Sequence, residues 1–285
     1  RPRLLIADDV GLGKTIEAGL IVAELMARRR LYRLMVVTPA GPLLSQWQSE
    51  MSERFGLRLD VVDRAKLDDI RRGAELGSNP FDQLSHTLVS MDFLKQDRVL
   101  DELERTLPYD LIIIDEAHHY NETGINETDR SDASQRRKLA EVLARKTDAL
   151  LLLTATPHDG YDRSFASLLE LLDPSLLDGK GKPREDVYRS HVIRRLKKHI
   201  TVRHPQSGEY VHFPERKIEP IEVGMDAEIH RDYVEMHRAL LGFIAPALKN
   251  ALRVKQYDDA LAYLALLKRS TSSVVAVRNT LQTVY

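Results

Sequence analysis

The sequence contains no cysteine, no long apolar run and no excess of charge of either sign. Without cysteine, the chain has no disulfides, no thiolate metal ligands and no cysteine nucleophile, which is compatible with a cytosolic setting. No apolar run approaches the roughly 20 residues of a membrane span, and we recognise no signal peptide. We therefore expect a cytoplasmic protein that makes no contact with a membrane.

The charges are balanced, because the sequence contains 42 lysine and arginine residues and 43 aspartate and glutamate residues. This balance neither predicts nor excludes nucleic-acid binding, since binding surfaces are local patches. At 285 residues and 43% hydrophobic content, the chain is long enough for one large or two ordinary domains with a real core. Because the sequence begins immediately before a strand-like run, we expect it to be a piece of a longer protein.

Short apolar runs alternate with helical patterns through the first half of the chain. Several runs are apolar throughout, as expected for strands that are covered on both faces. The alternation predicts an α/β fold with a parallel sheet flanked by helices, in which chemistry gathers at the carboxyl ends of the strands. The polar stretch 121–134 is predicted to be an exposed loop. The predicted strands are 3–7, 34–38, 59–62, 86–90, 111–114 and 150–153, and the predicted helices are 15–30, 43–55, 97–106, 134–145 and 165–172.

The first strand-like run is followed by a glycine-rich turn and the start of a helix. Gly11 and Gly13 would let the backbone bring its N–H groups close to an anion, and the helix that begins near Lys14 adds its positive N-terminal end. Lys14 would reach the β- and γ-phosphates of ATP, and the Thr15 hydroxyl would bind Mg²⁺. The general phosphate-loop pattern has glycine where this chain has Asp8, so an ordinary strand–turn–helix is the alternative for this stretch taken alone.

A second candidate site follows the predicted strand 111–114, which ends in Asp115 and Glu116. An acidic pair at the end of a buried strand is costly unless something cationic lies there. We expect Asp115 to hold Mg²⁺, directly or through water, and Glu116 to orient and deprotonate the attacking water. The alternative is a solvated, idle pair at the start of a helix.

A third candidate site follows the predicted strand 150–153, where the residues are Thr154, Ala155, Thr156 and Pro157. The hydroxyl groups would hydrogen-bond the acidic motif and report the nucleotide state to a bound polymer. An ordinary turn before a proline is the alternative.

These stretches, in this order, resemble the first RecA-like lobe of superfamily-two helicases, and most specifically the Swi/Snf family of DNA translocases. In that family's form of the phosphate loop, A-D-x-x-G-L-G-K-T, Asp8 is an expected residue. Motif agreement extends from residue 1 to about residue 160. The matching segments are 7–15, 115–118 (the D-E-A-H motif), 153–157 (L-T-A-T-P), 36–47 (similar to P-x-x-L-L-x-Q-W) and 88–94 (similar to the next DNA-contacting segment).

The resemblance implies a role for individual residues. His118 would couple the ATP site to a neighbouring lobe, and Thr154, Ala155 and Thr156 would take part in that coupling. Backbone phosphates of one DNA strand would be contacted, without readout of sequence, near Thr38, Pro39 and Ser90. The ATP-binding residues would be Asp8, Asp9, Gly11, Leu12, Gly13, Lys14 and Thr15, with Thr15 and Asp115 as the residues that bind the metal.

For two further groups of residues, the sequence allows either contact with DNA or a purely structural role. Gln46 either contacts DNA or packs on its helix, and for Trp47 core packing is the favoured interpretation. The basic stretch 194–198 resembles the family's R-R-x-K-K segment, and it lies either on DNA phosphates or on a solvated surface. From this stretch we take Arg194 and Arg195 as candidate DNA contacts.

We expect three regions in the chain. Residues 1–160 would form the first RecA-like ATP-binding lobe, 161–225 a family-specific extension that returns to this lobe, and 226–285 a helical region that leads to a second lobe. In the family that second lobe supplies arginine fingers, and nothing after Pro157 resembles it; the adenine-recognising segment is expected before residue 1. This piece alone should therefore bind ATP weakly and hydrolyse little.

The resemblance implies a DNA-stimulated ATPase that translocates on double-stranded DNA. Residues 266–273 are similar to a helix of bacterial members of the RapA type, and helicase-like subunits of antiphage systems such as DISARM belong to the same branch. The expected partners are duplex DNA, a second lobe of the same protein, and subunits of a defence or transcription complex. The alternatives are a strand-separating helicase or restriction-type motor, an ATP-gated scaffold without catalysis, and a small-molecule kinase.

Overall fold

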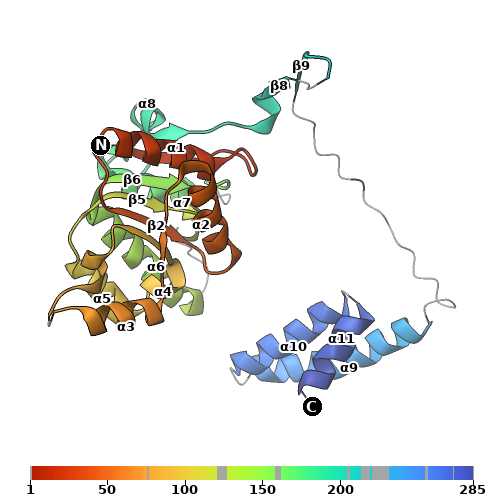
Figure 1. Ribbon diagram of the computed structural model, residues 1–285. Coiled ribbons are helices and arrows are strands. Elements are labelled where there is room, and N and C mark those ends of the chain that lie inside the picture. Colours follow the sequence, from red (N-terminus) through yellow and green to blue (C-terminus); the bar gives the residue numbers. More distant parts are fainter. Residues whose placement is uncertain are drawn as a thin grey trace. The chain divides into compact units, whose positions relative to one another are not determined.

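The computed structural model describes residues 2–75, 77–120, 127–157, 162–203, 206–212, 219, 231–253, 256–271 and 273–284. The chain divides into two compact units, Arg1–Glu215 and Arg216–Tyr285. In the first unit, helices lie on both faces of a parallel sheet, and most of the described residues of the second unit are helical (Figure 1).

Seven strands of the first unit form one sheet in the order β3-β4-β2-β5-β6-β1-β7, and every neighbouring pair is parallel. The predicted α/β class with a parallel sheet is confirmed, as are all six predicted strands. The seventh strand was not predicted, because two residues are too short a run to show a pattern. The strands are β1 (Arg3–Ile6), β2 (Leu34–Thr38), β3 (Asp60–Val62), β4 (His86–Ser90), β5 (Tyr109–Ile114), β6 (Thr147–Leu153) and β7 (Val192–Ile193).

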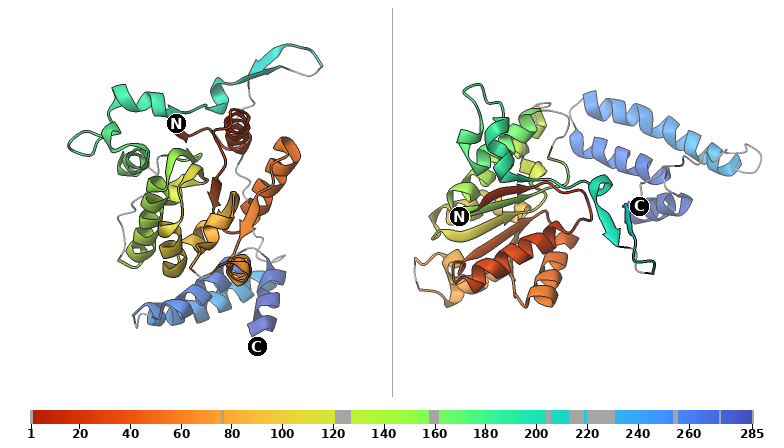
Figure 2. Two further views of the ribbon diagram at one scale, coloured as in Figure 1. Left: turned by 60° about the vertical axis from the view of Figure 1, so that its left-hand side comes forward. Right: turned by 90° about the horizontal axis from the view of Figure 1, so that it is seen from above.

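Alternate residues along the strands face opposite sides of the sheet, which produces two apolar cores. Leu5 belongs to the core under α3, α5, α6 and α7, whereas Ile6 belongs to the core under α1 and α2. In Figure 2 the red and orange helices α1 and α2 lie on one side of the sheet and the green helices α6 and α7 on the other. The helices are α1 (Lys14–Ala27), α2 (Pro42–Phe55), α3 (Arg64–Gly73), α4 (Met91–Leu94), α5 (Asp97–Arg105), α6 (Glu127–Arg145), α7 (Asp162–Leu172) and α8 (Glu185–Tyr188), and the short 3₁₀ turns include η1 (Pro80–Gln83) and η2 (Ala117–Tyr120).

The predicted loop 121–134 is wrong over its second half, because α6 already begins at Glu127. The sequence there is polar and lacks the apolar periodicity on which the prediction relied. Residues 121–126 lie outside the described part of the chain.

The side chain of Arg3 joins β1 to the ends of two helices on one face of the sheet. Its guanidinium donates to the carbonyl oxygens of Leu172 (2.5 Å), Leu171 (2.8 Å), Thr147 (3.0 Å) and Ala144 (3.3 Å). The last carbonyl groups of a helix have no partner within the helix and carry its negative end, so that a cation is favourable there. Arg3 therefore holds the carboxyl ends of α6 and α7 against the first strand.

On the opposite face, α1 and α2 approach closely at a glycine. A Cβ atom built on Gly19 would lie 2.2 Å from Cε2 of Phe55, a distance that such atoms do not show. Gly19 is buried in α1, and the ring of Phe55 covers it from the end of α2. The absence of a side chain at this position sets how close the two helices can pack.

The second unit contains α9 (Arg231–Arg253), α10 (Tyr257–Ser270) and α11 (Val274–Val284), which confirms the helical prediction for the described residues of this region. Tyr233 of α9 donates a hydrogen bond of 2.8 Å to the carbonyl oxygen of Ser270 at the end of α10. In the first unit, β8 (Thr201–Arg203) and β9 (Tyr210–His212) form an antiparallel hairpin. Among the helices described in both units, none has both the length and the apolar composition of a membrane span.

Candidate active site

The predicted motifs lie side by side along the carboxyl edge of the sheet. The register pairs the end of β2 with the ends of β4 and β5, and the end of β1 with the ends of β6 and β7. Since β5 also pairs with β6, the ends of six strands follow one another along this edge. The residues at or directly after these strand ends are, in spatial order, Ser90, Thr38, Asp115, Thr154, Ala7 and Arg194.

The turn after β1 has the backbone shape of a phosphate loop. Gly11 and Gly13 have φ angles of 80° and 85°, in the left-handed region that favours glycine. Helix α1 begins at Lys14, and no side chain caps it at Gly13, so that the N–H groups of its first turn stay available to an anion. The ammonium group of Lys14 lies over the loop and donates to the carbonyl oxygen of Asp8 at 3.0 Å.

The carboxylate of Asp8 is completely buried and is neutralised by Arg195. Its Oδ1 accepts a bond of 2.8 Å from the backbone N–H of Arg195, and its Oδ2 accepts one of 2.7 Å from Nε. Nη2 of Arg195 contacts both Asp8 and Glu17, and the bond to Asp8 raises the pKa of the guanidinium. Arg195 is thus engaged with two carboxylates at the phosphate loop, and its contact with DNA stays a prediction.

Asp115 follows β5 and is 8% exposed. Burial raises the pKa of its carboxyl, and two donors oppose this effect: the indole N–H of Trp47, 2.7 Å from Oδ2, and the backbone N–H of Glu116, 2.9 Å from Oδ1. The packing of Trp47 in the core is confirmed, since it is 1% exposed. Its bond to Asp115 was missed, although a buried tryptophan needs a partner for its N–H and so offered a signal.

Glu116 has a φ angle of 48°, which is unusual for a residue with a side chain. Such a conformation costs on the order of 1–3 kcal/mol and is often found at functional sites. The ring nitrogen Nδ1 of His118 lies 3.2 Å from Oε2 of Glu116. The hydrogen bond from His118, followed by the charges of His118 and Lys14, lowers the pKa of the Glu116 carboxyl, so that this group is ionised near neutral pH.

The same Nδ1 atom of His118 lies 3.0 Å from the hydroxyl oxygen of Thr154, which follows β6. The predicted hydrogen bond between this segment and the acidic motif is therefore confirmed. Thr154 is fully buried, and its hydroxyl oxygen accepts a further bond of 3.1 Å from the backbone N–H of Thr156, while Ala155 is partly exposed. The role of these residues in coupling stays a prediction.

The candidate DNA contacts at the ends of β2 and β4 differ in exposure. Thr38 has no exposed surface, and its hydroxyl donates to the carbonyl oxygen of Pro39 at 2.8 Å. Ser90 is partly exposed and caps α4 by accepting a bond of 3.2 Å from the backbone N–H of Phe93. Contact with DNA at this edge stays a prediction. Of the candidate residues here, Pro39 and Ser90 are accessible to a ligand.

The two remaining candidates for DNA contact, Gln46 and Arg194, are exposed. Gln46 lies on α2, and its amide donates to Oε1 of Glu50 at 3.0 Å, so that it does not pack in the core as Trp47 does. Arg194 follows β7 and lines a small hollow of about 200 Å³ together with Ala7.

The described residues contain no group of three or more histidine, cysteine, aspartate or glutamate side chains that could hold a metal ion. A magnesium site of the predicted kind needs no such group, because Mg²⁺ keeps several waters and is bound by one or two protein oxygens together with the phosphates. The hydroxyl of Thr15 and the carboxylate of Asp115 are oxygen donors of this type. The raised pKa of Asp115 shows that its charged form would gain from a cation, so these residues fit the ion.

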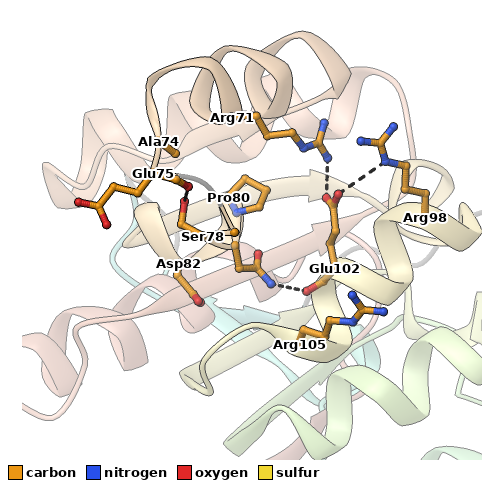
Figure 3. Close-up of a pocket in the computed structure, with 11 residues that line it drawn as sticks. Arg71, Ala74, Glu75, Ser78, Pro80, Asp82, Arg98, Glu102 and Arg105 are labelled. Atoms are coloured by element: carbon orange, nitrogen blue, oxygen red, sulfur yellow. Dashed lines mark hydrogen bonds and ion pairs between the residues drawn. The ribbon is translucent and has the colours of Figure 1, made fainter.

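A larger hollow, of about 660 Å³, lies between α3, η1 and α5 and contains no residue of these motifs (Figure 3). Its central carboxylate, Glu102, pairs with Arg71 at 2.5 Å and with Arg98 at 3.7 Å. Arg71 also pairs with Asp68 on its own helix. Its lining carries three arginine and three acidic side chains, so the hollow offers no net charge to a ligand.

A family model described as "Type III restriction enzyme, res subunit" matches residues 1–159. The chain belongs to this family. Among curated relatives, the RNA polymerase-associated protein RapA of Vibrio parahaemolyticus is 39% identical over 173 residues, which cover 61% of this chain and 17% of the relative. The RNA polymerase-associated protein RapA of Photobacterium profundum is 38% identical over 173 residues, which again cover 61% of this chain and 17% of the relative. The chain thus spans only 17% of the length of the relatives that it matches.

Two solved structures share the fold of this helicase-like domain. The SWI2/SNF2 ATPase core of Sulfolobus solfataricus, in complex with double-stranded DNA, matches with a TM-score of 0.54 and 19% identity, covering 96% of this chain and 55% of that one. The helicase domain of Hef from Pyrococcus furiosus matches with a TM-score of 0.50 and 19% identity, covering 94% and 54%. The chain is therefore a domain of this restriction-enzyme family that is similar in sequence to RapA and shares its fold with SWI2/SNF2 ATPase cores.

Proposed function

We propose that this helicase-like domain is the ATP-binding lobe of a DNA-stimulated motor that translocates on double-stranded DNA. One observation carries the proposal: the phosphate loop, the acidic pair and the segment 154–156 meet at one edge of the sheet. The positive charge of Lys14 favours the ionised form of both Asp115 and Glu116, so the loop and the acidic pair face one site.

The residues at this edge suit the binding and cleavage of a nucleoside triphosphate. The uncapped N–H groups of α1 and the ammonium of Lys14 would receive the phosphates. Thr15 and Asp115 would hold Mg²⁺, which when bound neutralises charge on the phosphate oxygens. The ionised carboxylate of Glu116 would orient the attacking water and accept its proton.

A second RecA-like lobe of the same protein would complete this site. The described residues contain a single parallel sheet, and an arginine finger from another lobe is typically worth roughly 10³–10⁵ in rate. The contact between His118 and Thr154 joins the acidic motif to the neighbouring strand end, which supports a role in passing the nucleotide state to that lobe. The isolated chain should accordingly bind ATP weakly and turn it over slowly.

The DNA partner would be held through its backbone phosphates, near Pro39, Gln46, Ser90 and Arg194. Such contacts position a duplex without reading its sequence. A solved relative of the same fold is described in complex with double-stranded DNA, and the curated relatives are described as RNA polymerase-associated. We infer a cytoplasmic motor that remodels protein–DNA complexes, with a transcription or antiviral defence complex as its setting.

A strand-separating or restriction-type motor is the second candidate, and the description of the matching family favours it. The two functions differ in their product, because a translocase displaces a third strand from a triplex whereas a helicase releases a single strand from a duplex. Both assays on the full-length protein would decide between them. A scaffold without catalysis would show no ATPase activity that rises with DNA.

The proposal is tested with full-length protein and its Lys14→Ala variant. We expect ATP hydrolysis that increases with duplex DNA in the unchanged protein and is abolished in the variant, because the ammonium that receives the phosphates is gone. Thermal unfolding controls for folding of the variant. Normal turnover by Lys14→Ala would sink the assignment of the loop.

A further inference from the structure

Residues beyond the family match run alongside the phosphate loop. The match ends at residue 159, whereas the backbone at residues 193–197, which we call the closing segment, bonds to both sides of Asp8. The N–H of Ala7 donates to the carbonyl oxygen of Ile193 at 2.7 Å, and the N–H of Asp9 to that of Arg195 at 3.1 Å. The N–H of Lys197 in turn donates to Oδ2 of Asp9 at 2.9 Å.

The side chain of Arg195 makes a second connection across the loop. Its guanidinium bonds to Asp8, which precedes the glycine-rich turn, and to Glu17, which lies in the first turn of α1. The turn between these two carboxylates carries Gly11 and Gly13. A single side chain therefore ties the residue before the turn to the helix after it.

The charges explain why this connection holds the loop in one shape. Asp8 is 0% exposed, and a buried carboxylate is costly unless it is paired and hydrogen-bonded. Without the guanidinium, Asp8 would keep only the backbone N–H of Arg195 as a donor from the closing segment. The remaining charge would have to be hydrated, and because the Arg195 side chain is half exposed, that water would enter between the loop and the closing segment.

A further cation of the closing segment borders the same turn. The ammonium nitrogen of Lys197 lies 3.7 Å from the point that a Cβ on Gly11 would occupy. The closing segment thus places a positive charge beside the glycine-rich turn as well as backbone bonds beside Asp8.

We propose that Arg195 is a positioning residue, which holds the phosphate loop in its anion-binding shape by bridging Asp8 and Glu17. The consequence for nucleotide affinity rests on the proposed function, but the effect on the loop itself does not. The lobe that binds ATP would then extend beyond the matched residues 1–159, because the loop depends on a segment that follows them.

The first test measures amide hydrogen exchange of the full-length protein without nucleotide. In Arg195→Gln and in Asp8→Asn, residues 8–17 should exchange faster than in the unchanged protein, whereas the central strands β2 and β5 should not. The double variant removes the cost of an unpaired buried charge but not the loss of the bridge, so its loop exchange should lie between those of Arg195→Gln and the unchanged protein. Arg189→Gln is the matched control, because it removes the same charge from an exposed pair with Glu185.

The second test measures binding of a fluorescent ATP analogue to the same proteins. Groups that orient the residues of a binding site typically change affinity by about 10- to 100-fold, and we expect a loss in this range for Arg195→Gln. The double variant should recover only part of the affinity, because the bridge is still missing. Arg195→Lys should bind more weakly than the unchanged protein and more tightly than Arg195→Gln, because one ammonium cannot bridge both carboxylates as the guanidinium fork does. Arg189→Gln should bind as the unchanged protein does.

Three outcomes are decisive. Loop exchange in Arg195→Gln that equals the unchanged protein would overturn the inference, and so would a uniform rise throughout the sheet, which would indicate a role in general stability. Absence of analogue binding by the unchanged protein would refute the proposed function. The exchange measurement would still decide the role of Arg195 in that case, so the two failures are distinguishable.

Discussion

The indole N–H of Trp47 donates a hydrogen bond of 2.7 Å to Oδ2 of Asp115, and this bond joins α2 to the end of β5. Asp115 is buried, so its carboxylate stays charged only with the help of donors. The backbone N–H of Glu116 is the second donor, at 2.9 Å. Trp47 is therefore a core residue that also orients the carboxylate proposed to hold magnesium.

Replacing Trp47 by phenylalanine should raise the magnesium requirement. Trp47→Phe keeps most of the packing but removes the donor from Asp115, whose charged form is then less favourable. Losing a group that orients a metal ligand typically costs about 10- to 100-fold in metal affinity, and we expect a shift of this size. The measurement is ATPase activity of the full-length protein against Mg²⁺ concentration.

Met51 supplies the control for this experiment, because it is buried on the same helix without a bond to the carboxylate. Met51→Ala should lower the temperature of thermal unfolding and leave the magnesium requirement unchanged. Equal magnesium curves for Trp47→Phe and the unchanged protein would show that the indole bond is dispensable.

Replacing Glu116 by glutamine should separate binding of ATP from its cleavage. The amide keeps the shape of the side chain but cannot accept the proton of the attacking water, so we expect hydrolysis to fall by about 10²–10⁴-fold. Affinity for a fluorescent ATP analogue should change little, since Lys14 and the loop are intact. Turnover within a few fold of the unchanged protein would remove Glu116 from its proposed role.

Gly19 and Phe55 should be energetically coupled. An alanine at Gly19 gains about 1 kcal/mol of helix propensity but forces a Cβ into the ring of Phe55, and overpacking typically costs about 1–3 kcal/mol. The change in the free energy of unfolding caused by Gly19→Ala should therefore be more favourable by about 1 kcal/mol or more in a Phe55→Leu background than in the unchanged protein. Denaturant unfolding of the four proteins of this cycle measures the coupling, and additive effects would contradict it.

Arg3 should contribute more to stability than an exposed arginine of the same unit such as Arg28. Arg3→Met leaves the carbonyl groups at the ends of α6 and α7 without their charged donor, and we expect a loss of about 3 kcal/mol in the free energy of unfolding. Arg28 is the control, because its ion pair with Glu24 is exposed. Arg28→Met should change stability by less than about 0.5 kcal/mol.

His86 at the start of β4 should make stability decrease in mild acid. Burial lowers the pKa of this imidazole, which means that the unfolded chain binds a proton at a higher pH than the folded chain does. Stability from this residue is therefore present above the ordinary histidine pKa of about 6.5 and is lost as the pH falls below it. We expect the unchanged protein to lose more free energy of unfolding between pH 7.5 and 5.5 than His86→Gln does, and equal losses would contradict this.

Much of the fold could be predicted because the strands of a parallel sheet are buried on both faces and so appear as continuous apolar runs. The runs around Val36, Ile113 and Leu151 all became central strands. The start of α6 could not be predicted from the same signal, since its first turns are polar. Nor could β7, whose two residues join the sheet only because they pair with Leu5 and Ile6.

In the candidate site, too, some features could be predicted from the sequence and others could not. The phosphate loop, the acidic pair and the segment 154–156 were recognisable because each depends on a few consecutive residues: glycine where φ is positive, carboxylates at a strand end, hydroxyls in a turn. Their meeting at one edge followed from the parallel direction of the strands. The bond between Trp47 and Asp115 joins residues 68 positions apart and has no local signature.

Asp8 marks the boundary between what the sequence determined and what the tertiary structure decided. The sequence alone showed an aspartate where a phosphate loop usually has glycine, within a stretch whose turn and helix start are local properties. The structure decided that this carboxylate is buried and that Arg195, 187 residues later, neutralises it. The physical reason is that backbone turns depend on neighbouring residues, whereas the partner of a buried charge depends on which strands the fold places side by side.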